Sequence, residues 1–163
     1  MPKQRFCDIV DGLAIIGSSA FAGSNLFIGL SVGLHWLRLD PLDFAFGFWD
    51  QFVMFTLTIM PLFTLTLVGL VCAAKRDWNH AHIRRSRLSA ITCFVIVSLI
   101  TVVLHVPINL ALRTPQFTAS EASAIRLRWL VGHVPRILLT GAVAWFTWRA
   151  CAGRFYQSVR EES

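Results

Sequence analysis

Charged residues are scarce in this sequence, and their absence is concentrated in blocks. Asp, Glu, Lys and Arg make up 15% of the chain, whereas they make up about a quarter of a soluble domain. Four stretches of about 20 residues or more lack them or nearly so: 12–34, 52–74, 88–112 and 129–148. This pattern excludes an ordinary soluble domain and indicates an integral membrane protein.

Each stretch is long enough to cross the hydrocarbon core of a bilayer as one helix, which takes about 20 apolar residues. Internal repeats, low-complexity segments and linkers are absent from the sequence. We therefore predict an all-α fold, in which residues 1–163 form a single domain. It is an up-down-up-down four-helix bundle with the four stretches as its spans.

Patterns of metal-binding or redox residues are also missing. The four cysteines include no Cys-x-x-Cys pair, and no His-x-x-x-His pair occurs. His80 and His82 are two residues apart in a basic loop, without a third ligand nearby. We therefore predict no metal site, and we interpret the cysteines as small apolar fillers near the cytoplasmic helix ends.

Basic residues are distributed unevenly between the two sides of the predicted bundle, although the net charge is only +6. The N-terminus, the loop between the second and third spans and the C-terminus together carry most of them: Lys3, Arg5, Lys75, Arg76, Arg84, Arg85, Arg87, Arg149, Arg154 and Arg160. The opposite side carries Arg38, Arg113, Arg126 and Arg128. The positive-inside rule then predicts cytoplasmic termini, in a bacterial inner membrane or a plasma membrane. Topology explains this basic bias, so we predict no nucleic-acid partner.

The N-terminal segment has some features of a signal peptide. Basic residues precede the first apolar run, and Ala20-Phe21-Ala22 resembles a cleavage site. Asp8 and Asp11 oppose this interpretation, as does the apolar run that continues to Leu34. We therefore retain the segment as the first span.

Aromatic residues in the predicted outer loop, 35–51, are interpreted as a belt at the membrane–water boundary.

Polar residues interrupt the third and fourth spans at their outer ends. His105 and Asn109 lie in the third span, and His133 and Arg136 in the fourth. With a rise of 1.5 Å per residue, His105 and Arg136 both lie roughly 10 Å below the outer end, and Asn109 and His133 roughly 5 Å. We therefore predict that His105 lies level with Arg136, and Asn109 level with His133, in a pocket that opens outward.

Four further residues are candidates for the same pocket. Trp129 shares a helix face with His133 and Arg136, while Asn25, His35 and Arg113 lie in or near the outer halves of their spans. An ionisable residue inside a membrane span is by default a candidate for function. The alternative is that these groups bond to one another and only determine helix packing. Two further alternatives stay open: a metal bound by the three histidines at the outer ends of the spans, His35, His105 and His133, or a haem between His105 and His133.

The four spans, Pro107-Ile108-Asn109 at the end of the third, and Trp129, His133 and Arg136 at the start of the fourth resemble the anthrone oxygenase-like family of small membrane proteins. This family is known mostly as a domain of unknown function. The resemblance covers the layout of the whole chain, and its specific part is confined to residues 105–136.

The resemblance implies a monooxygenase that inserts oxygen from O2 into a lipophilic aromatic substrate without a conventional cofactor. His105 or His133 would act as the base, Arg136 and Asn109 would stabilise the oxyanion, and Trp129 would stack on the substrate. We predict no cofactor, with copper, iron and haem as open alternatives. A non-catalytic binding or transport protein, or an accessory membrane protein, is the alternative function. The predicted partners are the lipid bilayer and a lipophilic small molecule, and the sequence does not indicate an oligomeric state.

Overall fold

Long helices make up almost the entire chain. The computed structural model describes residues 2–162, with side chains for residues 9–157. Within that range every regular element is helical, and α1 and α4 each continue through a short π-helical turn. The elements are α1 (Pro2–Phe27), η1 (Ile28–Val32), α2 (Gly33–Arg38), α3 (Pro41–Arg76), α4 (Ala81–Ile100), η2 (Thr101–His105), α5 (Val106–Ala111) and α6 (Ala119–Glu162).

Four helical segments are long and apolar enough to cross a membrane: Ile9–Arg38, Pro41–Arg76, Ala81–Ala111 and Ala119–Gln157. The prediction of an all-helical fold with four helices able to span a membrane is therefore confirmed for the described residues. Some residues used in the sequence analysis lie outside the described side chains. They are Lys3, Arg5 and Arg160, which entered the topology prediction, together with Cys7 and Asp8.

The helices extend beyond the apolar runs that predicted them. The expected loop at residues 35–51 shrinks to residues 39–40, because α2 ends at Arg38 and α3 begins at Pro41. Asp40 caps α3 by accepting a hydrogen bond from the Leu42 backbone N–H at 2.9 Å, and Pro41 occupies the first helical position, which it tolerates well. Hydropathy shows only the part of a helix that lies in lipid, so it underestimates helices that continue into water.

The start of α6 agrees with its local sequence signal. The Thr118 backbone N–H donates to Glu121 Oε2 at 2.8 Å, and the Glu121 N–H donates to Thr118 Oγ1 at 3.3 Å. These reciprocal bonds form a capping box, which satisfies backbone donors at a helix start.

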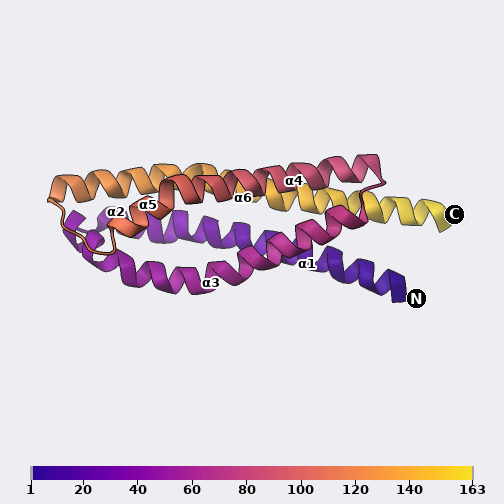
Figure 1. Ribbon diagram of the computed structural model, residues 1–163, viewed down its shortest axis with the longest axis horizontal. Coiled ribbons are helices and arrows are strands. Elements are labelled where there is room, and N and C mark those ends of the chain that lie inside the picture. The colour runs from indigo at the N-terminus through magenta and orange to yellow at the C-terminus, as the bar shows by residue number, and fades with distance from the viewer. Residues whose placement is uncertain (1, 163) are drawn as a thin grey trace.

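The helices form one elongated bundle, with both termini at the same end (Figure 1). We call the end with the termini and residues 77–80 the proximal end, and the end with residues 39–40 and 112–118 the distal end. The helix α4 packs along α6, and α1 packs against both α3 and α6. Residues from all four spans therefore come together inside the bundle.

Aromatic side chains near the distal end form a core rather than the predicted belt. Trp36, Phe44 and Phe48 are each 1% exposed, and the Trp36 ring contacts both phenylalanine rings at centroid distances of 5.4 and 5.3 Å. The belt interpretation is therefore wrong for these three residues. Phe46, by contrast, is exposed. Helical periodicity explains the difference, because Phe44 and Phe48 share the face of α3 that points into the bundle.

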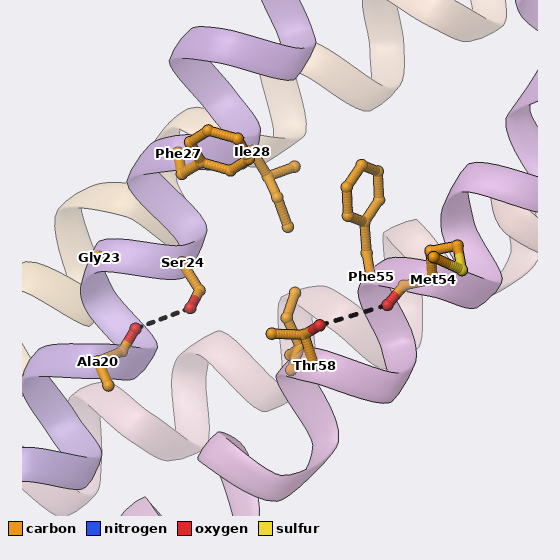
Figure 2. Close-up of a pocket in the computed structure, with 9 residues that line it drawn as sticks. Ala20, Gly23, Ser24, Phe27, Ile28, Met54, Phe55 and Thr58 are labelled. Atoms are coloured by element: carbon orange, nitrogen blue, oxygen red, sulfur yellow. Dashed lines mark hydrogen bonds between the residues drawn. The ribbon is translucent and has the colours of Figure 1, made fainter.

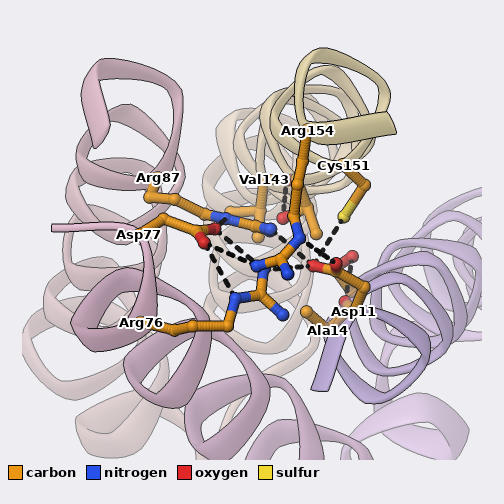
Figure 3. A network of polar contacts seen from close by, with 10 residues as sticks. Asp11, Ala14, Arg76, Asp77, Arg87, Val143, Cys151 and Arg154 are labelled. Atoms are coloured by element: carbon orange, nitrogen blue, oxygen red, sulfur yellow. Dashed lines mark hydrogen bonds and ion pairs between the residues drawn. The ribbon is translucent and has the colours of Figure 1, made fainter. Parts of the chain in front are cut away.

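Ion pairs join the four spans at the proximal end (Figure 3). Arg87 is fully buried and pairs with Asp11 at 2.6 Å and with Asp77 at 3.1 Å. Arg76 and Arg154 each pair with the same two carboxylates. We call these five residues the proximal ion cluster. Its members come from α1, α3, α4, α6 and the 77–80 turn, so it links all four spans.

Candidate functional site

A cavity of about 210 Å³ lies in the distal half of the bundle. It is partly open to the outside, because the exposed side chains of Met60 and Val106 belong to its wall. Helices α3 and α6, both π-helical turns and their neighbours contribute to its wall. The polar and ionisable members of the wall are Thr56, Thr101, Asn109, Trp129, His133 and Arg136, and the aromatic members from the first two spans are Trp36, Phe48, Phe52 and Phe55.

Arg136 is the most unusual side chain of this wall. The residue is only 8% exposed, and its Nε has no hydrogen-bond partner within the described part of the chain. The ion pairs among the described residues all belong to the proximal ion cluster, so no described carboxylate neutralises Arg136. A buried charge is normally paired, because its desolvation is costly. The cavity therefore presents an unpaired cation to whatever occupies it.

His133 is held in one tautomer by the first span. Its Nε2 lies 2.9 Å from the backbone carbonyl oxygen of Asn25. A carbonyl can only accept, so Nε2 carries the hydrogen and Nδ1 is the basic atom of the neutral ring. This Nδ1 is buried and has no partner among the described residues. His133 is thus oriented by one nitrogen, while the other nitrogen keeps its lone pair free of any hydrogen bond within the described chain.

Trp129 connects the polar residues of the third and fourth spans. Its ring stacks on His133, with centroids 4.9 Å apart and an interplanar angle of 11°, and its Nε1 donates to Asn109 Oδ1 at 2.9 Å. This bond orients the Asn109 amide, so that its Nδ2 hydrogens remain for a ligand. Trp36 packs edge-on against Trp129 at 5.0 Å and encloses the stack.

His105 lies behind the cavity wall rather than in it. Its ring contacts Trp129 at 5.1 Å and His133 at 5.9 Å, and neither ring nitrogen has a partner among the described residues. The residue is fully buried. His105 can therefore influence Trp129 and His133 by packing and charge, whereas the cavity itself is bounded by His133.

The predicted pairing of levels is wrong by about one helical turn. Asn109 bonds Trp129 instead of lying level with His133, and the ring of His105 contacts His133. The depths were counted from the ends of the apolar runs, but α6 begins at Ala119, well before Trp129. Span ends defined by hydropathy are therefore a poor origin for counting depth.

Six of the eight predicted site residues come together, and two do not. Asn25 is fully buried and contributes its backbone carbonyl, and its Oδ1 is a further buried atom without a partner in the described chain. His35 and Arg113 are exposed and do not line the cavity. The Arg113 guanidinium lies over the Trp49 ring at 5.5 Å, which accounts for its position.

Sequence reasoning missed the aromatic wall that α3 supplies. Phe48, Phe52 and Phe55 line the cavity, and their spacing of four and three residues places them on one helix face. That periodicity was the available signal.

The two π-helical turns were also missed. Pro107, which has no N–H to donate and lies just after η2, is the one local hint. Such turns occur frequently at functional sites.

Among the described residues, no group of three His, Cys, Asp or Glu side chains is arranged to hold a metal ion. Comparison with protein-family models, with curated proteins and with solved structures finds no match to this chain. The resemblance to the anthrone oxygenase-like family therefore stays a prediction.

Proposed function

We propose that the protein is a membrane-embedded monooxygenase of the anthrone oxygenase-like type, which oxidises a lipophilic aromatic compound with O2 in the distal cavity. One observation carries the proposal. Arg136 is a buried, unpaired cation in an aromatic wall, next to a histidine whose tautomer is determined. Such a site favours a ligand that is apolar overall but becomes negatively charged during the reaction.

The chemistry begins with removal of a proton from a methylene group beside the aromatic rings. His133 Nδ1 takes the proton, and the negative charge spreads to the substrate oxygen, where Arg136 and the Asn109 amide stabilise it. The carbanion then reacts with O2 and forms a new C–O bond. The methylene group becomes a carbonyl, and the second oxygen atom leaves as water with the two methylene protons. The substrate supplies all four electrons, so the balance needs no further reductant.

The size of the cavity limits the substrate. A cavity of about 150 Å³ holds one benzene ring, and the cavity described here has about 210 Å³. It fits a one- or two-ring compound as it stands. A tricyclic anthrone requires the aromatic wall to move outward, so the proposal predicts faster turnover of smaller analogues with the same acidic methylene group.

The test is O2 uptake by the protein in lipid nanodiscs after addition of anthrone or a smaller cyclic ketone analogue. Arg136→Met and His133→Gln should each lower turnover by about 100-fold or more, because each removes a group that acts on the developing charge. Arg113→Met is the matched control, since Arg113 is exposed and outside the cavity. Unchanged turnover in both cavity variants would contradict the assignment.

The same samples separate the alternatives. Saturable binding of the aromatic compound without O2 uptake would indicate a non-catalytic binding or transport protein. Copper, iron or haem at one equivalent per chain would move the reaction to a metal centre and would overturn the cofactor-independent chemistry. Neither binding nor uptake would favour an accessory membrane protein.

We also propose an up-down-up-down topology with cytoplasmic termini, in a bacterial inner membrane or a plasma membrane. The basic residues that flank the 77–80 turn support this orientation: Lys75, Arg76, Arg84, Arg85 and Arg87. Both termini also lie at the same end of the bundle (Figure 1). Reporter fusions at the C-terminus and at residues 114–117 should be active on opposite sides of the membrane. Activity of both on one side would refute the topology.

A further inference from the structure

A second hollow lies on the outer surface of the bundle, between α1 and α3 (Figure 2). It is an open groove of about 580 Å³. Its rim carries Phe27 and Met54, which are 58% and 67% exposed. Both residues lie in segments long and apolar enough to span a membrane, so we place the groove at the lipid-facing surface.

Close helix packing on one side of the groove and a proline in α3 explain why it exists. A Cβ atom added to Gly69 would lie 2.7 Å from the Ala14 Cα, and one added to Gly17 would lie 3.0 Å from the Thr66 backbone N. The two helices are therefore in backbone contact there. Pro61 lies between that contact and the groove, and α3 changes direction part-way along its length (Figure 1). Towards the distal end the helices diverge and leave the groove open.

The hydroxyl groups that line the groove have no free hydrogen to donate to a ligand. Ser24 donates to the Ala20 carbonyl of its own helix at 2.8 Å, and Thr58 donates to the Met54 carbonyl at 3.4 Å (Figure 2). Such bonds within one helix satisfy a hydroxyl in an apolar setting. The remaining lining is apolar, so the groove suits a lipophilic molecule dissolved in the bilayer.

Three side chains separate the groove from the distal cavity. Ile28, Phe55 and Ile59 line both hollows. Ile28 and Phe55 face each other across the groove in Figure 2. Ile28 is also the first residue of the π-helical turn η1. The two hollows are thus neighbours that share these three side chains as a common wall.

We propose that the groove is a lateral portal, through which a lipophilic aromatic compound passes from the bilayer into the distal cavity. Phe55 is the movable part of the gate, with Ile28 and Ile59 beside it. Rotation of one side chain joins the two hollows, a motion that takes far less reorganisation than separation of helices. The inference rests on the proposed function only in taking the distal cavity as the binding site, and it needs no assumption about the reaction.

Glycine positions allow the portal to be blocked without disturbing the fold. Gly23 lines the groove, and a Cβ atom added there meets nothing within 4 Å. Gly23→Phe should therefore fill the groove. Gly141 in α6 has equally open surroundings and lies outside both hollows, so Gly141→Phe is the matched control. Ala20→Phe, also in the groove, is the second blocking variant in case the first does not fold.

The probe is 4-bromophenol in lipid vesicles, because its bromine quenches tryptophan fluorescence. Trp36 and Trp129 line the cavity, so the other four tryptophans are replaced by phenylalanine in every variant: Trp49, Trp78, Trp145 and Trp148. Stopped-flow quenching then measures the rates of association and dissociation. Thermal unfolding of each variant checks that it is folded.

A blocked portal raises the free-energy barrier to entry into and exit from the distal cavity, but it does not change the free energy of the bound state. Gly23→Phe should slow association and dissociation together by about tenfold and leave Kd unchanged, whereas Phe55→Ala should speed both. Rates equal to those of Gly141→Phe would overturn the portal while leaving the cavity as a binding site. A change in Kd with unchanged association would make the groove a separate binding site. Absence of binding to the unblocked protein would refute the proposed function itself.

Discussion

Two buried arginines of α6 have opposite surroundings. Arg126 is 9% exposed, and its Nη1 donates to the carbonyl oxygens of Trp36 and Leu39 at 2.9 and 2.8 Å. These carbonyls are at the end of α2, where a cation is favourable. Arg136 is as deeply buried, but its Nε has no partner in the described chain. The first arginine joins α6 to the end of α2, whereas the second has no such partner for its Nε in the described chain.

Replacement by methionine should therefore change stability in opposite directions at the two positions. Arg136→Met removes an unpaired buried charge and should raise the free energy of unfolding by about 2 kcal/mol. Arg126→Met leaves the Leu39 carbonyl without a donor and removes one of the two donors to the Trp36 carbonyl, so it should lower this free energy by about 1–3 kcal/mol. Thermal or denaturant unfolding in the same detergent measures both. Destabilisation by Arg136→Met would mean that this arginine has a structural partner and would weaken its functional assignment.

At the scale of the helices, α1 and α3 depend on backbone contact. Gly69 faces Ala14 so closely that an added Cβ atom would lie 2.8 Å from the Ala14 N. Small residues let helices approach where lipid supplies no hydrophobic driving force. The atoms in the way belong to the backbone, so a side-chain rotation cannot relieve the clash.

Gly69→Ala should consequently separate α1 from α3 and lower the unfolding midpoint. We expect a loss of about 1–3 kcal/mol, the usual cost of overpacking. Gly141→Ala is the matched control, because its Cβ would meet nothing within 4 Å. Alanine there should be neutral or stabilising by up to about 1 kcal/mol, since glycine is the poorer helix former. Equal effects at both positions would contradict the close packing.

On the scale of the whole molecule, the proximal ion cluster joins the four spans. Asp77 lies in the turn between α3 and α4 and is 1% exposed. Burial alone would raise the pKa of its carboxyl group. The hydrogen bonds and positive charge of Arg76, together with those of Arg87, outweigh burial and hold this pKa below its ordinary value. The ionised carboxylate is therefore the form that stabilises the fold.

The sign of the pH dependence follows from that lowered pKa. A carboxyl group with a pKa lower in the folded than in the unfolded state stabilises the protein above the unfolded value, about 3.9. This stability is lost as the pH falls through the folded pKa. Asp77→Asn should cost about 1–3 kcal/mol at pH 7, because buried Arg87 loses one of its two carboxylate partners and keeps Asp11. The difference from the unmodified protein should shrink below about pH 4. Unfolding midpoints between pH 3 and 8 measure it, and a difference that is constant with pH would contradict this account.

The order of apolar residues in the sequence determined that the chain has four helices long and apolar enough to span a membrane, because a helix in lipid requires about 20 apolar residues in a row. The capping box at Thr118 and Glu121 was equally local. The polar residues of the cavity could also be recognised from the sequence, since His133 and Arg136 interrupt an apolar run. These features depend on solvent and on neighbours in the chain.

Only the tertiary structure decided which residues meet. Helical periodicity gives the relative faces of residues within one helix, but it gives neither the rotation of a helix about its axis nor its shift along a neighbour. The contact of Trp129 with Asn109 depends on that shift, and the exposure of His35 depends on that rotation. The proximal ion cluster depends on both, because its carboxylates and arginines come from segments far apart in the chain.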